Sequence, residues 1–453
     1  MIIREESPTS RYFLFGLPKL ATNIIIGFAD FSLATLYILA YRVPIFLVAL
    51  GLSLGKLTIA FSFFFFGWIS DIKYTRWGRR KPYLIIMSPI LGLSFIFLLM
   101  PNLMINLNDK FLLFIWLIIW YQIFNITFAL TAPYGAWLAE QFRSYERPKA
   151  SQFDFTFASI GTAIMAIFSL IVLTGFINKI QKYPSIIPSE YFFSVIIFGI
   201  LVIVLFYLVS FLMPTEPHFK IESNIFQNLK TILKNKNYIS VNIMIGIGSL
   251  AWVQISSLIL LFLAVVLVFE EIYYIIGAAI FLLGILIFIY IWRLLIYKLG
   301  KKRCLLYIFL SAIIFLPCTL LALIPMTSTF IYGLLFIIGI AGCIAGWYLL
   351  QPIYIADIAE DDEKTTGELK AGIYKGFPSI FLNIFQSLGL LMMGLILSLP
   401  SISIRNSTFS IGYILWGPIC SVILIIAYLY SKKYVKLDFE WEKLGQNNTD
   451  SFK

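Results

Sequence analysis

The sequence predicts an all-α membrane protein with about twelve transmembrane helices, arranged as two pseudo-symmetric six-helix bundles. The first observation is composition: 60% of the 453 residues are hydrophobic, against roughly 45–50% in an ordinary soluble domain. The second is that the apolar residues form long runs; residues 192–213, for example, contain no charged side chain. Such a run matches the ~20 residues that a helix needs to cross a bilayer. The third is a basic turn that recurs at matching places in the two halves of the chain.

Each apolar run is expected to form a helix, because lipid offers no hydrogen-bond partners to backbone groups. The expected spans cover residues 13–40, 44–70, 82–100, 111–139, 153–177, 191–213, 239–268, 272–297, 304–325, 329–356, 372–399 and 408–431. The first span is long, so we expect it to be tilted or kinked. A polar segment divides the chain into an N-terminal bundle over 1–213, a linker over 214–238, a C-terminal bundle over 239–431 and a tail over 432–453.

The distribution of Lys and Arg predicts the orientation in the membrane. Basic residues cluster in the loop after the second span and in the loop after the eighth, whereas the loop after the ninth has no charge. The positive-inside rule then places both termini and the linker in the cytoplasm of a multi-pass protein in the cell membrane. Because these loops account for much of the net charge of +11, no nucleic-acid partner is expected. No cofactor is expected either.

The two halves look like sequence repeats. Gly78-Arg79-Arg80-Lys81 follows the second span, and Gly300-Lys301-Lys302-Arg303 follows the eighth, 222 residues later. The fourth span of each half ends in acidic residues that can pair with the basic turn of the same half. Two parallel six-helix repeats of this kind are typical of the major facilitator architecture.

A gating role is predicted for the charged residues and the glycine of these regions. They are Asp71, Arg76, Gly78, Arg79 and Arg80 in the first half, and Lys301, Lys302 and Asp357 in the second. Such a cluster can latch the cytoplasmic side of a carrier that faces outward. The alternative is that the cations only hold the loops in the cytoplasm.

Asp30 is the leading candidate for a functional residue. It lies inside the first apolar span, where an ionised group costs at least ~2.5–3.5 kcal/mol. Helical spacing places small, polar and aromatic residues on its face, among them Asn23, Gly27 and Tyr37. We therefore expect a water-filled cavity in which Asp30 and Tyr37 bind substrate and Asp30 carries a coupling proton. The alternative is a structural aspartate that is hydrogen-bonded to a neighbouring helix.

Other spans offer further polar or aromatic candidates. Those predicted to bind substrate are Asn125, Trp347, Gln351 and Asn383, and Asp154 is a second candidate for proton coupling. An enzyme is not expected, because the only histidine, His218, lies in the linker. The sequence also lacks a zinc cluster, a P-loop and a Gly-x-Ser-x-Gly motif.

Residues 67–82, 132–147, 157–159 and 356–372 resemble the glycoside–pentoside–hexuronide:cation symporter family of the major facilitator superfamily. The resemblance covers nearly the whole chain and implies alternating-access transport of a small polar solute, with a sugar or glycoside expected. Asp30, Phe31 and Tyr37 match the family's sugar-binding aspartate and the residues that follow it.

Other family positions differ in this chain. Ile59 and Phe63 stand where the family has two sodium-binding aspartates, and Phe155 and Asn383 replace a sugar-binding arginine and a lysine. The resemblance therefore implies a transporter that is coupled to protons or uncoupled, and not coupled to sodium. Two alternatives stay open, which are a carrier of lysolipids or other amphiphiles and a membrane sensor that does not transport.

Overall fold

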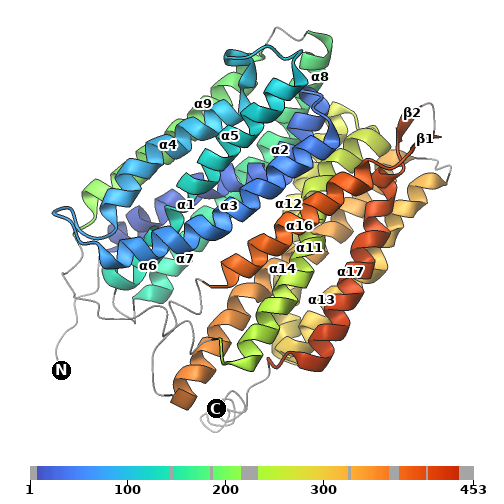
Figure 1. The fold of residues 1–453 in the computed structure, drawn as a ribbon. Helices are drawn as coiled ribbons and strands as arrows, with labels where there is room; N and C mark the ends of the chain where they lie inside the picture. The colour runs from blue at the N-terminus through green and yellow to red at the C-terminus, as the bar shows by residue number, and fades with distance from the viewer. Residues whose placement is uncertain are drawn as a thin grey trace, which may run out of the picture.

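The computed structural model describes residues 8–142, 146–183, 187–215, 233–324, 328–366, 377–404 and 407–437. Twelve of the helices in these ranges are long and apolar enough to cross a membrane, and Figure 1 shows how they are arranged. The predicted all-α membrane fold is therefore confirmed. Most of the predicted linker 214–238 and most of the predicted tail 432–453 lie outside the described residues, so these boundaries stay predictions.

The N-terminal half supplies the first six spans, several of which consist of more than one helical segment. Its elements are α1 (Thr9–Phe31), α2 (Leu33–Thr35), η1 (Leu36–Ala40), α3 (Ile45–Ile72), α4 (Lys81–Leu99), η2 (Pro101–Leu103), α5 (Lys110–Phe128), α6 (Thr131–Gln141), α7 (Arg147–Ile167), η3 (Phe168–Leu173), α8 (Thr174–Lys182) and α9 (Ser189–Leu212). Helix α1 packs on α7 and α9, and α4 packs on α5 and α9.

Helices α4 and α9 approach closely at a pair of glycines. A Cβ atom added to Gly92 would lie 2.4 Å from the carbonyl oxygen of Gly199, so no larger residue fits at this crossing. Small residues at such crossings let membrane helices gain van der Waals contact where lipid gives no hydrophobic driving force.

The C-terminal half supplies the other six spans and a short hairpin. Its elements are α11 (Lys236–Leu261), η4 (Phe262–Val266), α12 (Glu271–Leu299), α13 (Lys301–Phe315), η5 (Leu316–Leu323), α14 (Thr329–Thr366), α16 (Pro378–Leu397), β1 (Ser401–Ile404), β2 (Ser407–Ser410) and α17 (Gly412–Tyr434). Strands β1 and β2 pair antiparallel. Helix α11 packs on α16 and α17 and is the most enclosed span of this half.

Two local features recur in both halves and confirm the pseudo-symmetry. Gly78 and Gly300 both have positive φ, at 101° and 84°, in the two basic turns. The first helix of each half ends in a π-helical turn followed by a residue with positive φ, Arg42 at 52° and Val268 at 50°. The backbone hydrogen bonds at these two helix ends also correspond. In the first half, Tyr41 N donates to Leu36 O and Val43 N donates to Tyr37 O. In the second half, Leu267 N donates to Phe262 O and Phe269 N donates to Leu263 O.

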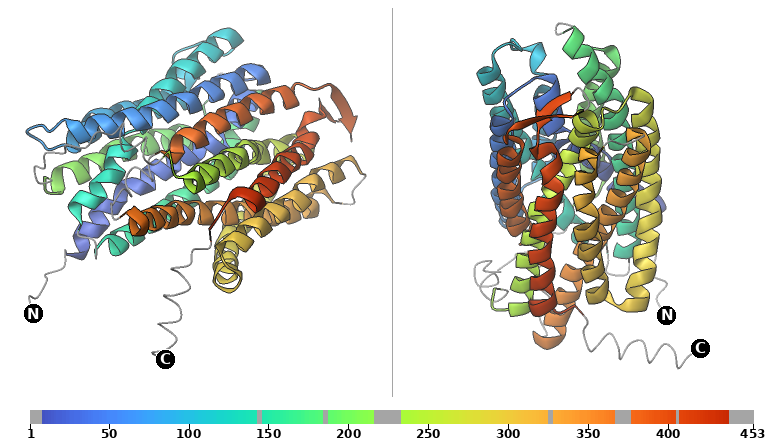
Figure 2. Two further views of the ribbon diagram at one scale, coloured as in Figure 1. Left: turned by 60° about the horizontal axis from the view of Figure 1, so that its bottom comes forward. Right: turned by 90° about the vertical axis from the view of Figure 1, so that its right-hand side faces the viewer.

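The halves meet most extensively along α3 and α16. Gly394 packs directly against Ala49, and the hydroxyl groups of Ser53 and Ser387 are 2.7 Å apart. In Figure 1 the halves come together near the β1–β2 hairpin and spread apart toward the ends that carry the basic turns. Figure 2 shows that the helices of both halves run in roughly one direction, with the hairpin at one end. The contacts between the halves are therefore concentrated toward the hairpin side.

Candidate functional site

An ion pair inside the membrane-spanning region is the central feature of the candidate site. The Nζ atom of Lys56 on α3 lies 2.6 Å from Oδ1 of Asp30 on α1. The side chain of Lys56 is only 6% exposed, and that of Asp30 is 27% exposed. Asp30 was predicted from the sequence as a functional residue, whereas Lys56 was not. The bond to Lys56 is a contact with a neighbouring helix of the kind that the alternative interpretation of Asp30 expected.

The fold brings the two residues together because α1 and α3 are antiparallel neighbours in sequence. Val43 lies in the turn that joins the two spans. Asp30 precedes it by 13 residues and Lys56 follows it by 13 residues. At a rise of ~1.5 Å per residue, equal distances from a turn place two residues at the same depth. This symmetry about Val43, together with a lysine inside an apolar span, is the sequence signal that could have identified Lys56.

Asp30 also lies at a break in the first span and at the boundary between the halves. The helix α1 ends at Phe31, and Ser32 has non-helical backbone angles, with φ −126° and ψ −18°. The hydroxyl of Ser257 on α11 donates to the backbone carbonyl of Asp30 at 3.3 Å. The ion pair therefore belongs to the N-terminal half but is in contact with the C-terminal half.

Two tyrosines lie close enough to the pair to interact electrostatically with both charges. They are Tyr121 on α5, which is buried, and Tyr348 on α14, which is 52% exposed. Asp30, at 27% exposed, and Tyr348 therefore both have accessible surface. A carboxylate accepts hydrogen bonds, an ammonium group donates them and a phenol does both. The cluster can therefore bind the hydroxyl groups of a polar solute.

Asn125, predicted to bind substrate, lies beside this cluster. Its Nδ2 atom donates to the backbone oxygen of Tyr121 at 2.7 Å. Both side chains pack against Gly55, where an added Cβ would be 2.7 Å from Nδ2 of Asn125. The Oδ1 atom of Asn125 is buried and has no hydrogen-bond partner. Buried polar atoms are normally satisfied, so this acceptor suits a buried water, but Asn125 is only 1% exposed and has almost no surface for a solute in this conformation.

The helical spacing in the sequence predicts that Tyr37 shares the face of Asp30. In the structure it does not. The break at Ser32 and the π-helical turn η1 interrupt the helical register between the two residues. The hydroxyl of Tyr37 donates instead to the backbone oxygen of Leu98 at 2.7 Å, and its side chain is fully buried. In this conformation Tyr37 has no exposed surface with which to contact a solute.

The structure places the remaining predicted substrate residues in three different settings. Trp347 is buried and stacks on Trp252 with ring centroids 5.5 Å apart, so it fills the core of the second half. Asn383 is also buried, and its Nδ2 atom donates to the backbone oxygen of Ser379. Gln351 is half-buried, and its Nε2 atom has no partner. Of the three, Gln351 is the one that is partly exposed, although its unpartnered Nε2 atom is itself buried.

Asp154, the second predicted coupling residue, lies far from Asp30. It is next to Tyr134, whose hydroxyl donates to the backbone oxygen of Phe15 on α1. Phe15 precedes Asp30 by 15 residues, which is roughly 22 Å along a helix. The two carboxylates therefore do not form one site.

The basic turn of the first half binds an acidic residue at the end of its own fourth span. Gly78 has φ 101° and closes the turn. Oε1 of Glu140 accepts from Arg79 Nη2 at 2.9 Å and from Arg80 Nη2 at 2.8 Å. Arg80 also donates to the hydroxyl of Ser70 at 2.6 Å. Both arginines are buried, so the turn is held by a compact network inside one half.

The basic turn of the second half makes the corresponding contact. Lys301 Nζ lies 2.6 Å from Asp357 Oδ2, and the two side chains are 20% and 13% exposed. This is the pairing within one half that the sequence analysis expected. Lys302 is half-buried next to it, while Arg76 is exposed and lies over the ring of Trp77. The side chain of Asp71 lies outside what the structure describes, and the gating role of these residues stays a prediction.

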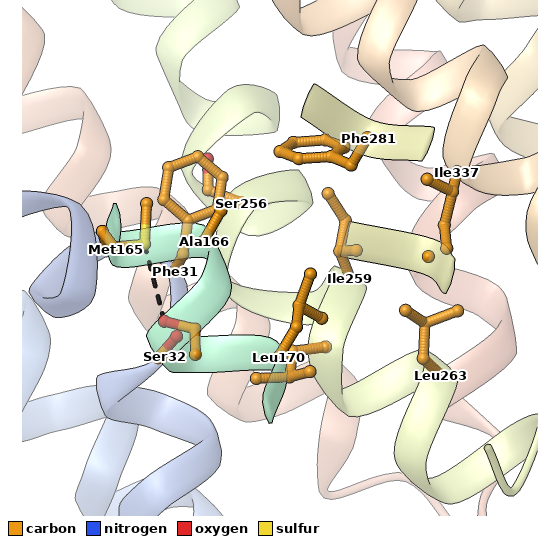
Figure 3. A pocket seen from close by; sticks show the side chains of 13 residues that line it. Phe31, Ser32, Met165, Ala166, Leu170, Ser256, Ile259, Leu263, Phe281 and Ile337 are labelled. Carbon is orange, nitrogen blue, oxygen red and sulfur yellow. Dashed lines mark hydrogen bonds between the residues drawn. The ribbon is translucent and has the colours of Figure 1, made fainter. Parts of the chain in front are cut away.

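An apolar cavity lies between the halves on another side of α1 (Figure 3). Its lining combines residues of both halves, including Phe31, Met165, Leu170, Ile259, Phe281 and Ile337. Neither Asp30 nor Lys56 belongs to the lining. The charged pair and the apolar cavity are therefore two separate features at the boundary between the halves.

The twelve spans, their repeat and the paired basic turns define a transporter of the major facilitator superfamily. The fold of solved transporters is similar over almost the whole chain. A D-xylose–proton symporter has 16% identity and a TM-score of 0.64, covering 95% of this chain and 97% of the other. The nucleoside transporter NupG has 16% identity and a TM-score of 0.62, covering 93% and 100%. A bacterial homologue of the human lysosomal transporter Spinster, inward-facing and unoccupied, has 14% identity and a TM-score of 0.63, covering 96% and 100%.

Residues 14–429 match the model of one family, described as MFS/sugar transport protein. The chain belongs to this family, which includes the glycoside–pentoside–hexuronide symporters expected from the sequence. No curated protein sequence matches the chain.

Proposed function

We propose that the protein is a secondary transporter, and not an enzyme, that moves a small polar solute of the sugar or nucleoside type across the cell membrane by alternating access. The observation that carries the proposal is the buried Asp30–Lys56 pair at the boundary between the halves. Charged groups inside a membrane protein are expensive and are generally retained for function. An accessible Tyr348 beside the pair supports a solute-binding role for this cluster.

The chemistry of the cluster suits a solute with several hydroxyl groups. The exposed part of the Asp30 carboxylate accepts hydrogen bonds, and the Lys56 ammonium group donates them; charge-assisted bonds of this kind are stronger than neutral ones. Tyr348, which is exposed, adds a phenol. A polyhydroxylated ring can satisfy all of these groups at once, which a purely apolar solute cannot do.

The conformation fits one state of an alternating-access cycle. Contacts between the halves are concentrated toward the β1–β2 hairpin, whereas each basic turn is paired within its own half. With the termini and basic turns in the cytoplasm, as the positive-inside rule predicts, this state is closed to the outside. Transport then requires the halves to separate near Ser53 and Ser387 and to approach at the basic turns.

Sodium coupling is not part of the proposal. Ile59 is buried, and Phe63 packs near Phe128 with ring centroids 6.3 Å apart. The positions that carry sodium-binding aspartates in related symporters are therefore occupied by apolar side chains in a packed region. Coupling to protons and transport without an ion are the two remaining modes.

Uptake of labelled sugars and nucleosides by proteoliposomes tests the proposal. We expect Asp30→Asn to lower uptake by about tenfold or more, because a hydrogen bond to a charged group is worth ~1.5–3 kcal/mol. Asp109→Asn is the matched control, because Asp109 caps α5 at the hairpin side and asparagine can cap equally well. Uptake by Asp30→Asn at the level of Asp109→Asn would exclude Asp30 from the site.

A second candidate function is transport of an amphiphile, and the apolar cavity of Figure 3 supports it. We rank it second because neither charged residue lines that cavity. Labelled lysolipids in the same uptake assay distinguish the two. Uptake of lysolipid without any uptake of sugars or nucleosides would reverse the ranking.

A further inference from the structure

We infer that Lys56 is a built-in counter-ion for Asp30 that takes the place of a mobile coupling cation, so that transport requires neither sodium nor a bound proton. The inference rests on the proposed function, because it concerns how the same site completes a transport cycle. Of the two remaining modes, coupling to protons and transport without an ion, it selects the second. It attributes this mode to Lys56.

The position of Lys56 is that of a bound cation. Its Nζ atom is 2.6 Å from the Asp30 carboxylate, and its side chain is much less exposed than that of Asp30. An ammonium group so enclosed cannot easily leave for water, while the carboxylate keeps an exposed part for a solute. The charge of Asp30 is therefore already compensated before any ion arrives.

The pair is contained in one half of the molecule. Both α1 and α3 belong to the N-terminal half, and in major facilitator carriers alternating access is largely a rigid movement of one half against the other. The hydrogen bond from Ser257 to the backbone of Asp30 joins the two halves, so its length changes when the halves move. The Lys56–Asp30 bond does not cross, so it persists in both end states and keeps the site neutral throughout.

The surroundings of Lys56 leave little for a free cation to bind. Among the described residues, the titratable groups that act on Lys56 are Asp30, Tyr121 and Tyr348, so in this part of the chain the cluster has one carboxylate, which Lys56 already occupies. Ile59 lies nearly one turn further along α3 and offers no oxygen ligand. A hard cation prefers several oxygen ligands, and this site supplies them only if Lys56 is removed.

The test compares wild-type, Lys56→Met and Asp30→Asn/Lys56→Met proteins in proteoliposomes, with uptake measured with and without sodium at neutral and acidic pH. For the wild type we expect uptake that is independent of both ions. For Lys56→Met we expect loss of uptake in sodium-free neutral buffer and recovery by about tenfold or more on adding sodium or acid, because removing one partner leaves an uncompensated buried charge. The double variant, which has no charge to compensate, should not respond to either ion. Lys433→Met, at an exposed position at the end of α17, is the control.

A second readout does not require transport. In detergent, sodium should raise the unfolding temperature of Lys56→Met and leave that of the wild type unchanged, because a ligand that binds only the folded state stabilises it. Lys56→Arg, which keeps the positive charge, should behave as the wild type does. If Lys56→Met cannot be purified, sodium-stimulated uptake by Lys56→Gln decides the question in its place.

The outcomes separate the inference from the function on which it rests. If the wild type takes up no labelled solute above empty liposomes, the proposed function fails. If the wild type transports but is stimulated by sodium or by a proton gradient, or if Lys56→Met transports equally well without ions, Lys56 is not the counter-ion.

Discussion

The two halves share a fold and a basic turn but differ in where they hold charge. The N-terminal half has an ion pair within the membrane and two buried arginines on Glu140 at its basic turn. At the basic turn of the C-terminal half, Lys301 pairs with Asp357, and α11 has no charged residue after Lys236. Its interior instead holds neutral groups, such as Gln254 and Trp252, each buried with one polar atom unpartnered. The comparison teaches that duplicated architecture does not require duplicated chemistry, because both halves pair charges at their basic turns but, among the described residues, the ion pair within the membrane belongs to the N-terminal half.

The largest expected effect of a single change at the basic turns is that of Glu140→Gln. It removes the carboxylate that neutralises Arg79 and Arg80, and breaking a buried pair costs about 3–5 kcal/mol. A clear fall in the unfolding temperature of the purified protein in detergent should follow. Glu190→Gln is the control, because Glu190 pairs with Lys179 only at an exposed position. If the two variants melt together, the buried network does not stabilise the N-terminal half.

A smaller loss is expected for Asp357→Asn in the second half. Asp357 pairs with Lys301, and both side chains are partly exposed, so we expect a cost of about 1–2 kcal/mol. The same melting assay should place this variant between Glu140→Gln and the wild type. A fall as large as that of Glu140→Gln would show that the two turns are equivalent, which would break the comparison.

The smallest effect is expected for Ser53→Ala at the contact between the halves. Its hydroxyl bond to Ser387 is neutral, and interhelical bonds of this kind average about 0.6 kcal/mol in a membrane protein. Because the bond joins the halves, its loss should shift the balance of conformations about threefold toward the state open on the hairpin side. Spin-label distances between α3 and α16 measure that shift.

Ser421→Ala provides the matched control for this third change. The Ser421 hydroxyl donates to Ile313 within the C-terminal half, so its loss should leave the balance of conformations unchanged. Equal distance distributions for the two variants would mean that the Ser53–Ser387 bond does not hold the halves together.

The fold was largely predictable from the sequence because hydropathy and charge determine it locally. The predicted start of span ten at residue 329 coincides with the start of α14 at Thr329. Its predicted end at 356 was too early, since α14 continues to Thr366. The acidic residues there lower hydropathy without breaking a helix, and Asp357 pairs with Lys301. The length of the first span predicted that it would be tilted or kinked, and the structure has a break at Ser32, a position that the sequence analysis did not specify.

The candidate site was predictable only in part. Asp30 stood out because one carboxylate in an apolar span is a strong signal. Lys56 gives the same kind of signal but was overlooked, although its distance from Val43 matches that of Asp30. Tyr37 was chosen for its helical register with Asp30, which the break at Ser32 and the turn η1 interrupt, and Trp347 was chosen by residue type; both are buried in the core. Aromatic residues are so frequent in this chain, at 17%, that residue type alone does not indicate which of them face a cavity.

The neutrality of the Asp30–Lys56 pair has a consequence for energetics in a polarised membrane. Moving one elementary charge through a potential of 100 mV involves about 2.3 kcal/mol. Opposite charges 2.6 Å apart that move together with their half cross almost the same field in opposite sense, so the work on them cancels. On the uncoupled mechanism inferred above, the resting voltage would therefore neither drive nor oppose the passage of this site from one side to the other, and for an uncharged solute the concentration gradient alone would set the direction of net flux.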